Sequence, residues 1–234
     1  MATILTIESS GSTCGVGLIV DGIYKQEYSI EGGNIHDRLL ADSVRKIISE
    51  NELQLKSSID AVAVSAGPGS FTGIRIGACV AKGLCYGNEP KFIAVPTLKA
   101  IAKAFIDMKI QINNDYIRPI VASVNNTAFI SKFDNNLNEQ SEIELIDLKN
   151  LAAKISNSDV LCGNIGEIFE LPHNNNKSIN FYPVNLSPKH IAILANEMYG
   201  QGLFTNPEEF KPIYAQDFVP KIKLQKIKSV DKIT

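Results

Sequence analysis

The sequence predicts an α/β protein with mixed sheets and flanking helices. Three observations indicate this class. The chain opens with three short segments rich in β-branched residues, then alternates helical and strand-like segments, and begins a second strand-rich unit near residue 115. An opening meander followed by alternating helices and strands is typical of α/β proteins whose sheets combine antiparallel and parallel pairs.

The first hundred residues carry the clearest pattern. Strands are expected at 3–8, 14–20 and 23–30, and the dipeptide Asp21-Gly22 between the last two is a strong hairpin signal. A helix is expected at 36–51, where apolar residues recur at helical spacing. The segments expected next are a strand at 61–65, a glycine-rich loop, a helix to about 86, a strand at 92–95 and a helix at 96–105.

The second half is less regular. Its expected elements are strands at 117–123 and 128–133, a polar loop at 134–140, a short helix at 148–156, a short strand at 160–162, a loop at 172–178 and an amphipathic helix at 188–199. We therefore expect two small domains, 1–104 and 105–234. The helix at 188–199 is a candidate to pack back on the first domain, and a Lys-rich tail occupies 219–234.

Composition and charge disfavour several classes of function. The 234 residues carry a net charge of −2, whereas a protein that grips tRNA unaided usually has a strong basic excess. No signal peptide or long apolar run is visible, and the four cysteines match no zinc spacing. We expect a cytoplasmic protein without membrane or metal. The last fourteen residues hold five lysines. We favour a solvated tail for this segment, and the alternative is contact with tRNA phosphates within a complex.

The segment SAGPGSFTGIRIG, residues 65–77, is the most informative. It lacks the lysine of a Walker A loop, its glycines are one residue too far apart for a dinucleotide fingerprint, and it lacks the G-x-S-x-G of a nucleophile elbow. A plain strand-to-helix turn is the favoured interpretation, with an anion site at the helix start as the alternative. The candidate anion or nucleotide loop comprises Glu8, Ser9, Ser10, Gly67, Gly69 and Ser70.

The helix that follows this loop is apolar on nearly every side, with Arg75 and Lys82 as its only charges. Such a helix is buried on two sides, here against a sheet and either another protein or the rest of the chain. We expect contact with another protein, because the small residues of this helix would let a partner helix approach closely. The expected contact residues on this helix and on the helix at 36–51 are Leu39, Leu40, Ser43, Val44, Ile47, Ile74, Gly77, Ala78 and Ala81.

Four motifs in this order resemble the TsaB (YeaZ-type) family. The opening ILTIESSGSTCGVGL is similar to the family's "ILAIDTST…SVAL", and HDRLL from His36 is similar to its "HS..L". AGPGSFTGIRIG with AKGL at 81–84 nearly reproduces its diagnostic motif, and FIAVPTLKAIA at 92–102 is similar to "GVSSLEALA". The resemblance is dense over 3–105 and thin beyond. Residues 123–130, SVNNTAFI, lack the acid and arginines of the family's "DARR.EVY" hairpin.

The resemblance implies an ASKHA (actin and sugar-kinase-like) fold and a non-catalytic role. It implies a subunit that binds and supports TsaD, the transferase that places threonylcarbamoyl on adenosine 37 of tRNA. TsaE, an ATPase, would join the pair, and tRNA would bind only to the complex. The chain alone would be a homodimer without a cofactor of its own, and nucleotide at the subunit interface is left open.

The same resemblance implies the absence of catalytic and metal residues. The His-x-x-x-His metal motif of TsaD falls here on Thr97 and Ile101, neither of which suits a transition metal. His36, His173 and His190 lie far apart in the sequence and form no ligand cluster.

Two alternatives remain open. The first is an active small ASKHA kinase or peptidase, for which Glu8 and the turn at 9–12 would form half of a site, with no second half visible. The second is a stand-alone homodimeric binding module that uses the same helices on itself. ATPase and peptidase assays distinguish the active enzyme from a supporting subunit. Subunit exchange on mixing with TsaD distinguishes the stand-alone module from a TsaD-binding subunit.

Overall fold

The computed structural model describes residues 2–32, 36–87, 90–111, 114–165 and 180–214, and the side chains of 36–39 lie outside this description. The first half follows the expected order, with element ends shifted by a few residues at most. Its elements are β1 (Thr3–Glu8), β2 (Thr13–Val20), β3 (Ile23–Glu31), α1 (His36–Glu50), β4 (Ala61–Ser65), α2 (Phe71–Cys85), β5 (Lys91–Val95) and α3 (Thr97–Asp107).

The second half differs more from expectation. Its elements are β6 (Tyr116–Ala122), β7 (Thr127–Asp134), β8 (Glu139–Asp147), the 3₁₀ turn η1 (Leu148–Asn150), α4 (Leu151–Lys154), β9 (Asp159–Asn164), β10 (Phe181–Pro183) and α5 (Pro188–Gly200). The sequence pattern missed β8 and β10, and the polar loop expected at 134–140 ends where β8 begins. The loop expected at 172–178 and the tail at 219–234 lie outside the described residues.

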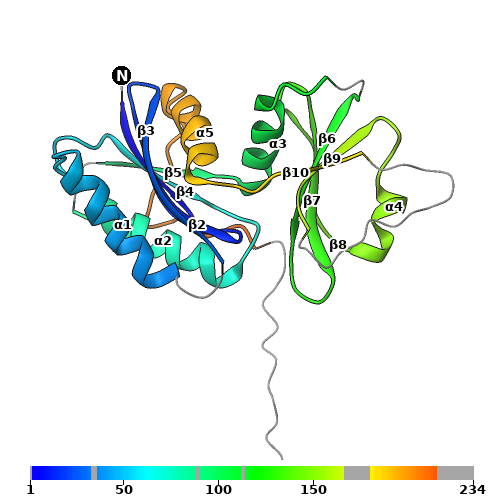
Figure 1. Ribbon diagram of the computed structural model, residues 1–234, viewed down its shortest axis with the longest axis horizontal. Coiled ribbons are helices and arrows are strands. Elements are labelled where there is room, and N and C mark those ends of the chain that lie inside the picture. Colours follow the sequence, from blue (N-terminus) through cyan, green and yellow to red (C-terminus); the bar gives the residue numbers. More distant parts are fainter. Residues whose placement is uncertain (1, 33–35, 88–89, 112–113, 166–179, 215–234) are drawn as a thin grey trace, which may run out of the picture.

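The strands form two five-stranded sheets with one topology. The first sheet has the order β3-β2-β1-β4-β5 and the second β10-β9-β6-β7-β8. In each, the first strand in the sequence is central, pairs antiparallel with the next strand and pairs parallel with a later one. Figure 1 shows the two sheets side by side, with α1 and α2 on the outer face of the first and α3 and α5 in the space between them.

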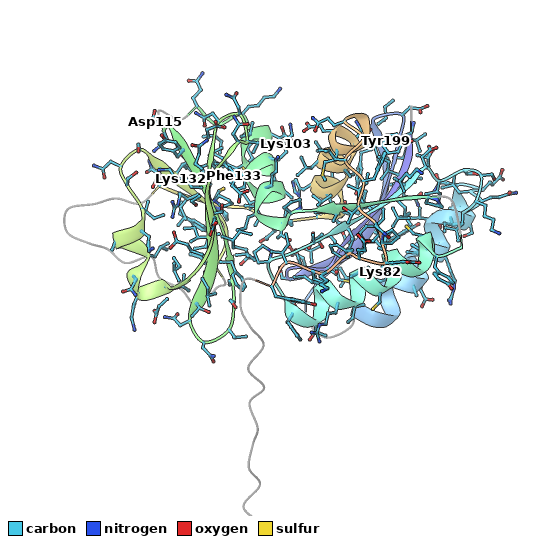
Figure 2. The ribbon with its side chains drawn as sticks, turned by 180° about the vertical axis from the view of Figure 1, so that it is seen from behind. Lys82, Lys103, Asp115, Lys132, Phe133 and Tyr199 are labelled. Carbon is cyan, nitrogen blue, oxygen red and sulfur yellow. The ribbon has the colours of Figure 1, made fainter. Side chains whose placement is uncertain are left out.

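The core between the sheets joins the two halves. Its buried side chains come from both sheets and from α3 and α5, and include Ile4, Ile93, Ile101, Ile117 and Ile191. Two other clusters lie under α1 and α2 and under α4. Lys103 of α3, labelled in Figure 2, forms ion pairs with Glu197 of α5 at 3.0 Å and with Asp107 at 3.5 Å.

After α5 the chain returns across the first sheet. Residues 203–214, called the strap below, make an isolated bridge between Thr205 and Phe92. The Phe210 ring packs 4.9 Å from the ring of Phe92, centroid to centroid. Lys82 of α2, labelled in Figure 2, donates from Nζ to the Phe210 carbonyl at 2.9 Å. None of the helices in the described part of the chain has the length and apolar character that crossing a bilayer requires.

Candidate functional site: a closed glycine loop and an apolar helix face

The glycine-rich loop and the turn after β1 are joined directly. The backbone N–H of Ser70 donates to the Ser10 carbonyl at 2.7 Å. A Cβ at Gly69 would lie 2.3 Å from that carbonyl oxygen, and a Cβ at Gly73 would lie 2.0 Å from the carbonyl oxygen of Ser9. Only glycine permits so close an approach of two backbones, which explains the residue type at both positions.

The Glu8 carboxylate lies inside this turn, against Ser10. Its carboxyl is fully buried, and Oε1 accepts from both the N–H and the hydroxyl of Ser10, each at 2.6 Å. Oε2 has no hydrogen-bond partner among the residues that the structure describes. Burial away from water raises the pKa of Glu8 to about 7, although the bonds from Ser10 oppose that shift.

The loop donors are thus used within the chain. The N–H of Ser10 donates to Glu8 Oε1, and the N–H of Ser70 donates to the Ser10 carbonyl. The Gly73 N–H donates to the Ser70 hydroxyl at 3.2 Å. Of the candidate loop residues, Ser70 is exposed and Gly69 half-buried, whereas Glu8, Ser9, Ser10 and Gly67 are buried. This geometry favours the plain strand-to-helix turn, because a phosphate would need the same N–H groups.

Thr97 and Ile101, which the resemblance places at the TsaD metal motif, serve packing in this structure. Thr97 accepts from the Gly67 N–H through Oγ1 at 3.1 Å and donates its own N–H to the Gly67 carbonyl at 2.9 Å. Ile101 is 1% exposed in the core between the sheets. The start of α3 is therefore fastened to the glycine loop by Thr97. No group of three potential metal ligands gathers in the part of the chain that the structure describes.

The contact residues expected on α1 and α2 do not form an exposed surface, which corrects the expectation. Their burial has a simple cause: the small residues of α2 let the helix lie close on its own sheet, and a Cβ at Gly77 would lie 2.2 Å from the Ser9 hydroxyl. Ser43 is half-buried, and the side chain of Leu39 lies outside the described residues. Those buried in the chain's own core are Leu40, Val44, Ile47, Ile74, Gly77, Ala78 and Ala81.

The opposite side of α2 carries an apolar stripe that the sequence pattern did not single out. Ile76 and Val80 are half-buried, Cys79 and Gly83 are exposed, and Tyr86 at the C-cap is 81% exposed. These five residues, called the outer ridge below, recur at helical spacing along one face. A contiguous apolar ridge on the surface is typical of a protein–protein contact. The signal was present in the sequence, but periodicity alone did not say which apolar face meets the sheet.

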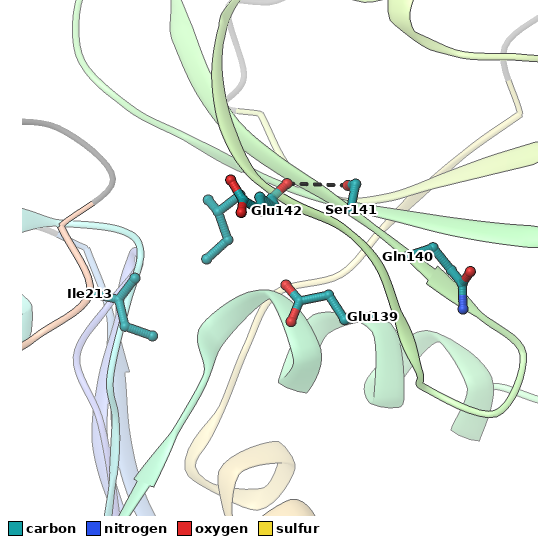
Figure 3. Close-up of a pocket in the computed structure, with 6 residues that line it drawn as sticks. Glu139, Gln140, Ser141, Glu142 and Ile213 are labelled. Atoms are coloured by element: carbon teal, nitrogen blue, oxygen red, sulfur yellow. Dashed lines mark hydrogen bonds between the residues drawn. The ribbon is translucent and has the colours of Figure 1, made fainter.

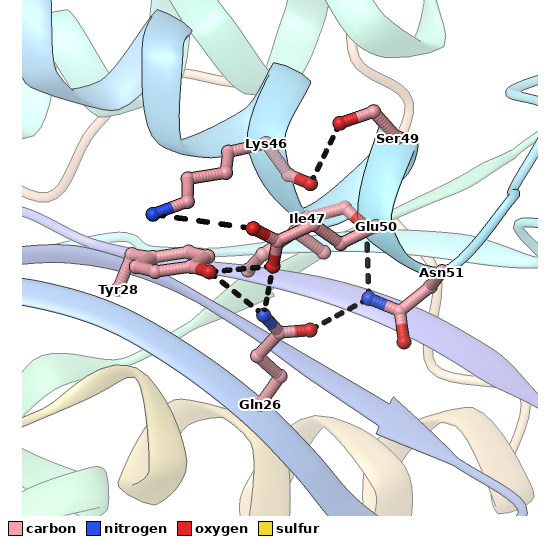
Figure 4. Close-up of polar contacts among 7 residues, drawn as sticks. All are labelled: Gln26, Tyr28, Lys46, Ile47, Ser49, Glu50 and Asn51. Carbon is pink, nitrogen blue, oxygen red and sulfur yellow. Dashed lines mark hydrogen bonds and ion pairs between the residues drawn. The ribbon is translucent and has the colours of Figure 1, made fainter.

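Polar contacts fix α1 beside β3 (Figure 4). The Glu50 carboxylate accepts from the Tyr28 hydroxyl at 2.5 Å and from Gln26 Nε2 at 2.6 Å, and these bonds lower its pKa. Asn51 Nδ2 donates to Gln26 Oε1 at 2.7 Å. Lys46 lies 4.1 Å from the Tyr28 ring centroid. The network fixes the C-terminal half of α1 against β3.

The start of α2 is held to the strap by an aromatic and cationic stack. The Arg75 guanidinium lies 3.7 Å from the Phe71 ring centroid and donates from Nε to the Tyr214 hydroxyl at 3.0 Å. Phe71 and Tyr214 themselves pack at 5.1 Å between centroids. Sequence reasoning missed this cluster because Tyr214 is distant along the chain, and nothing local indicates where it lies.

Comparisons with known proteins agree with this architecture. A family model described as "TsaD: tRNA N6-adenosine threonylcarbamoyltransferase" matches residues 31–125. The chain is 32% identical over 106 residues to "tRNA threonylcarbamoyladenosine biosynthesis protein TsaB" of Haemophilus influenzae, covering 45% of this chain and 44% of that protein. It is 35% identical over 100 residues to the Escherichia coli protein of the same name, covering 43% and 42%. The matched segments thus span less than half the length of these relatives.

Solved structures extend the likeness to the whole fold. "YeaZ from Pseudomonas aeruginosa" superposes with a TM-score of 0.75 at 20% identity, covering 92% of this chain and 100% of that one. A second Pseudomonas aeruginosa structure, described as an uncharacterized protein with similarity to peptidase YEAZ, gives 0.77 with the same identity and coverage.

Two mixed sheets of one strand order, each flanked by helices, define an α/β protein of the ASKHA-like class. The sequence similarity to curated relatives covers less than half of the chain, and the fold similarity covers nearly all of it. In these respects the chain is similar to TsaB and YeaZ proteins.

Proposed function

We propose that the chain takes part in threonylcarbamoyladenosine biosynthesis in tRNA as a non-catalytic subunit that binds TsaD. The names of its curated relatives support the pathway, and the match to the TsaD family model supports a related fold in the partner. The outer ridge of α2 is the observation that carries the binding role, because it is a partly exposed apolar face on a helix already packed on its sheet.

The closed glycine-rich loop supports a subunit without catalytic activity of its own. Glu8 and the glycine loop use their polar groups on each other, and Thr97 and Ile101 serve packing. A kinase would need an open phosphate loop and acidic residues for Mg²⁺. The alternative of an active kinase or peptidase therefore has less support than a subunit that supplies a binding surface.

The proposed complex uses α1 and α2 against the corresponding helices of TsaD. Two similar helix pairs can pack as a four-helix contact, and the same ridge can pair with itself across a two-fold axis when TsaD is absent. TsaE would then join the TsaB–TsaD pair, and tRNA would bind to the assembly in the cytoplasm. The chain would need no cofactor of its own, and a nucleotide at the subunit interface would be held by both partners.

Co-purification with the TsaD of the same cell tests the proposal. The two chains should elute together with the mass of a complex, and homodimers should exchange subunits with TsaD when mixed. The isolated chain should transfer no threonylcarbamoyl to tRNA and should show no ATPase or peptidase activity. Robust transfer by the chain alone, or no association with TsaD at micromolar concentrations, would overturn the proposal.

A further inference from the structure

An open cleft separates the second sheet from the strap. It has a volume of about 630 Å³ and is lined by residues 139–143 of β8 and by Ile213 of the strap. Figure 3 shows β8 on one side of this cleft and Ile213 on the other. No residue of α1 or α2 is among the described residues that line the cleft, so it is separate from the outer ridge proposed for TsaD.

The cleft is acidic. Glu139 and Glu142 are exposed, and Figure 3 shows both carboxylates on the side of β8 that faces Ile213, whereas Gln140 points the other way. No lysine or arginine is among the described residues that line it. Two carboxylates without a cation disfavour a nucleotide or an RNA phosphate here and favour a positively charged ligand.

The backbone of β8 favours a ligand that is an extended peptide. β8 is the edge strand of the second sheet, with β7 as its only partner strand among the described residues. An edge strand presents a row of N–H and C=O groups that an added strand can pair with, while side chains on either side set specificity. The combination of a free edge and two carboxylates fits a lysine-rich extended segment.

The chain itself contains such a segment. Residues 215–234 continue directly from the strap and hold five lysines against two aspartates, a net side-chain charge of +3. Lys221 is seven residues beyond Tyr214, which an extended chain spans in about 24 Å. Residues 221–224 alternate lysine with an apolar residue, the pattern of a strand that has one polar and one apolar face.

We propose that the acidic edge of β8 is a docking site for the chain's own Lys-rich tail, residues 219–234. The docked tail keeps its lysines on Glu139 and Glu142 and away from RNA phosphates. This goes beyond the proposed function: it gives the chain an internal competitor for tRNA, so that the lysines become free only when RNA displaces the carboxylates. It also fits a protein whose net charge of −2 conceals a basic terminus.

Carbodiimide cross-linking of the full-length protein tests the docking. The reagent joins an amine to a carboxylate only where the two touch, and mass spectrometry then identifies the pairs. We expect links from Lys221 or Lys223 to Glu139 or Glu142, lost in a Glu139→Gln, Glu142→Gln double variant. Glu208→Gln, Glu209→Gln is the control, because these two strap carboxylates are also exposed and lie much closer to the tail along the chain than Glu139 and Glu142 do.

Trypsin supplies a second readout on the same proteins. Cleavage after Lys221 and Lys223 should be about threefold faster or more in the double variant than in the parent, and 0.5 M salt should remove the difference, because exposed ion pairs are weak and screened. Links to Glu208 and Glu209 as frequent as those to β8 would overturn the proposal. So would links only between isotopically light and heavy copies, which would place the tail on another molecule. Loss of TsaD binding would bear on the proposed function and not on this result.

Discussion

The Ser70 backbone N–H donates to the Ser10 carbonyl oxygen at 2.7 Å and so joins the turn after β1 to the start of α2. This contact brings together two segments that are distant in the sequence, and the glycines around it let the two backbones meet. It fixes the distance between α2 and its sheet. The outward position of the ridge on α2 therefore depends on this turn as well as on the helix itself.

Gly73 should be the most sensitive helix position in this contact. Its Cβ would lie 2.0 Å from the Ser9 carbonyl oxygen, so Gly73→Ala should destabilise the fold by about 1–3 kcal/mol or more, because backbone must move. At Gly83 of the same helix an added Cβ would meet nothing within 4 Å, and Gly83→Ala should be neutral or stabilising by up to about 1 kcal/mol. Urea unfolding of both variants measures the difference. Equal stability of the two would contradict the close approach at Ser9.

Glu8 should make stability fall as pH rises through the neutral range. Its pKa is about 7 in the folded chain against 4.5 as the ordinary value, so between these two pH values the folded state holds a proton that the unfolded state has released. Stability at this site is therefore highest below about pH 4.5 and lowest above about pH 7.

The comparison that isolates this effect is Glu8→Gln, which titrates in neither state. The stability difference, variant minus parent, should become more favourable to the variant from pH 5 to pH 8, as measured by urea unfolding. Comparing the two proteins removes the opposite contribution of His190, whose pKa is lowered by burial and which is present in both. A pH-independent difference would mean that Glu8 is ionised throughout this range.

The sequence indicated the first sheet well because its strands are bounded by strong turn signals, such as Asp21 and Gly22 with positive φ. It did not indicate β8, whose residues are mostly Glu, Gln and Ser and which is only half-buried at a sheet edge. The common strand order of the two sheets leaves no visible sequence repeat, because topology constrains where apolar residues lie and not which they are.

The candidate site shows the same limit. The apolar character of α2 was readable, but Gly77, Ala78 and Ala81 were assigned to the wrong face. Small residues suit a close helix–sheet contact as well as a helix–helix contact, and one sequence does not distinguish them. The role of Thr97 was likewise hidden, since its partner Gly67 lies in a loop whose path depends on the whole sheet.

Phe210 should anchor the strap. It is 7% exposed and packs on Phe92, so Phe210→Ala should cost about 3–5 kcal/mol of stability. Phe204 is the matched control, because it belongs to the same strap, is 42% exposed and packs on Tyr199 at 5.4 Å, and its replacement by Ala should cost clearly less. Thermal unfolding of the two variants compares their losses of stability. Similar losses would mean that the strap is held along its length and not at Phe210.

Removal of the residues after Phe218 should weaken tRNA binding by the assembled complex. The deleted segment carries five lysines, and each lysine that neutralises a phosphate contributes roughly one unit to the slope of log affinity against log salt. Assembly with TsaD should be unchanged, which size-exclusion chromatography checks. Unchanged tRNA affinity and salt slope would leave the tail without an RNA contact.

The outer ridge of α2 should bind TsaD, and two classes of substitution on one helix separate binding from folding. Ala78 is 5% exposed, so Ala78→Glu buries an unpaired charge in the core and should unfold the chain at a cost of several kcal/mol. Cys79, the next residue, is exposed, so Cys79→Glu should leave the melting temperature within about 2 °C of the parent, as surface substitutions usually do.

In the complex, Cys79→Glu should place a charge inside an apolar contact and lower the affinity for TsaD tenfold or more, because the carboxylate loses water without gaining a partner. Val124→Glu provides the control, since Val124 is a 68% exposed apolar residue in the turn between β6 and β7, outside the helix pair. It should bind TsaD like the parent. A folded Cys79→Glu protein that binds TsaD at full affinity, together with a folded Val80→Glu protein that does the same, would place the TsaD contact on another face of the molecule.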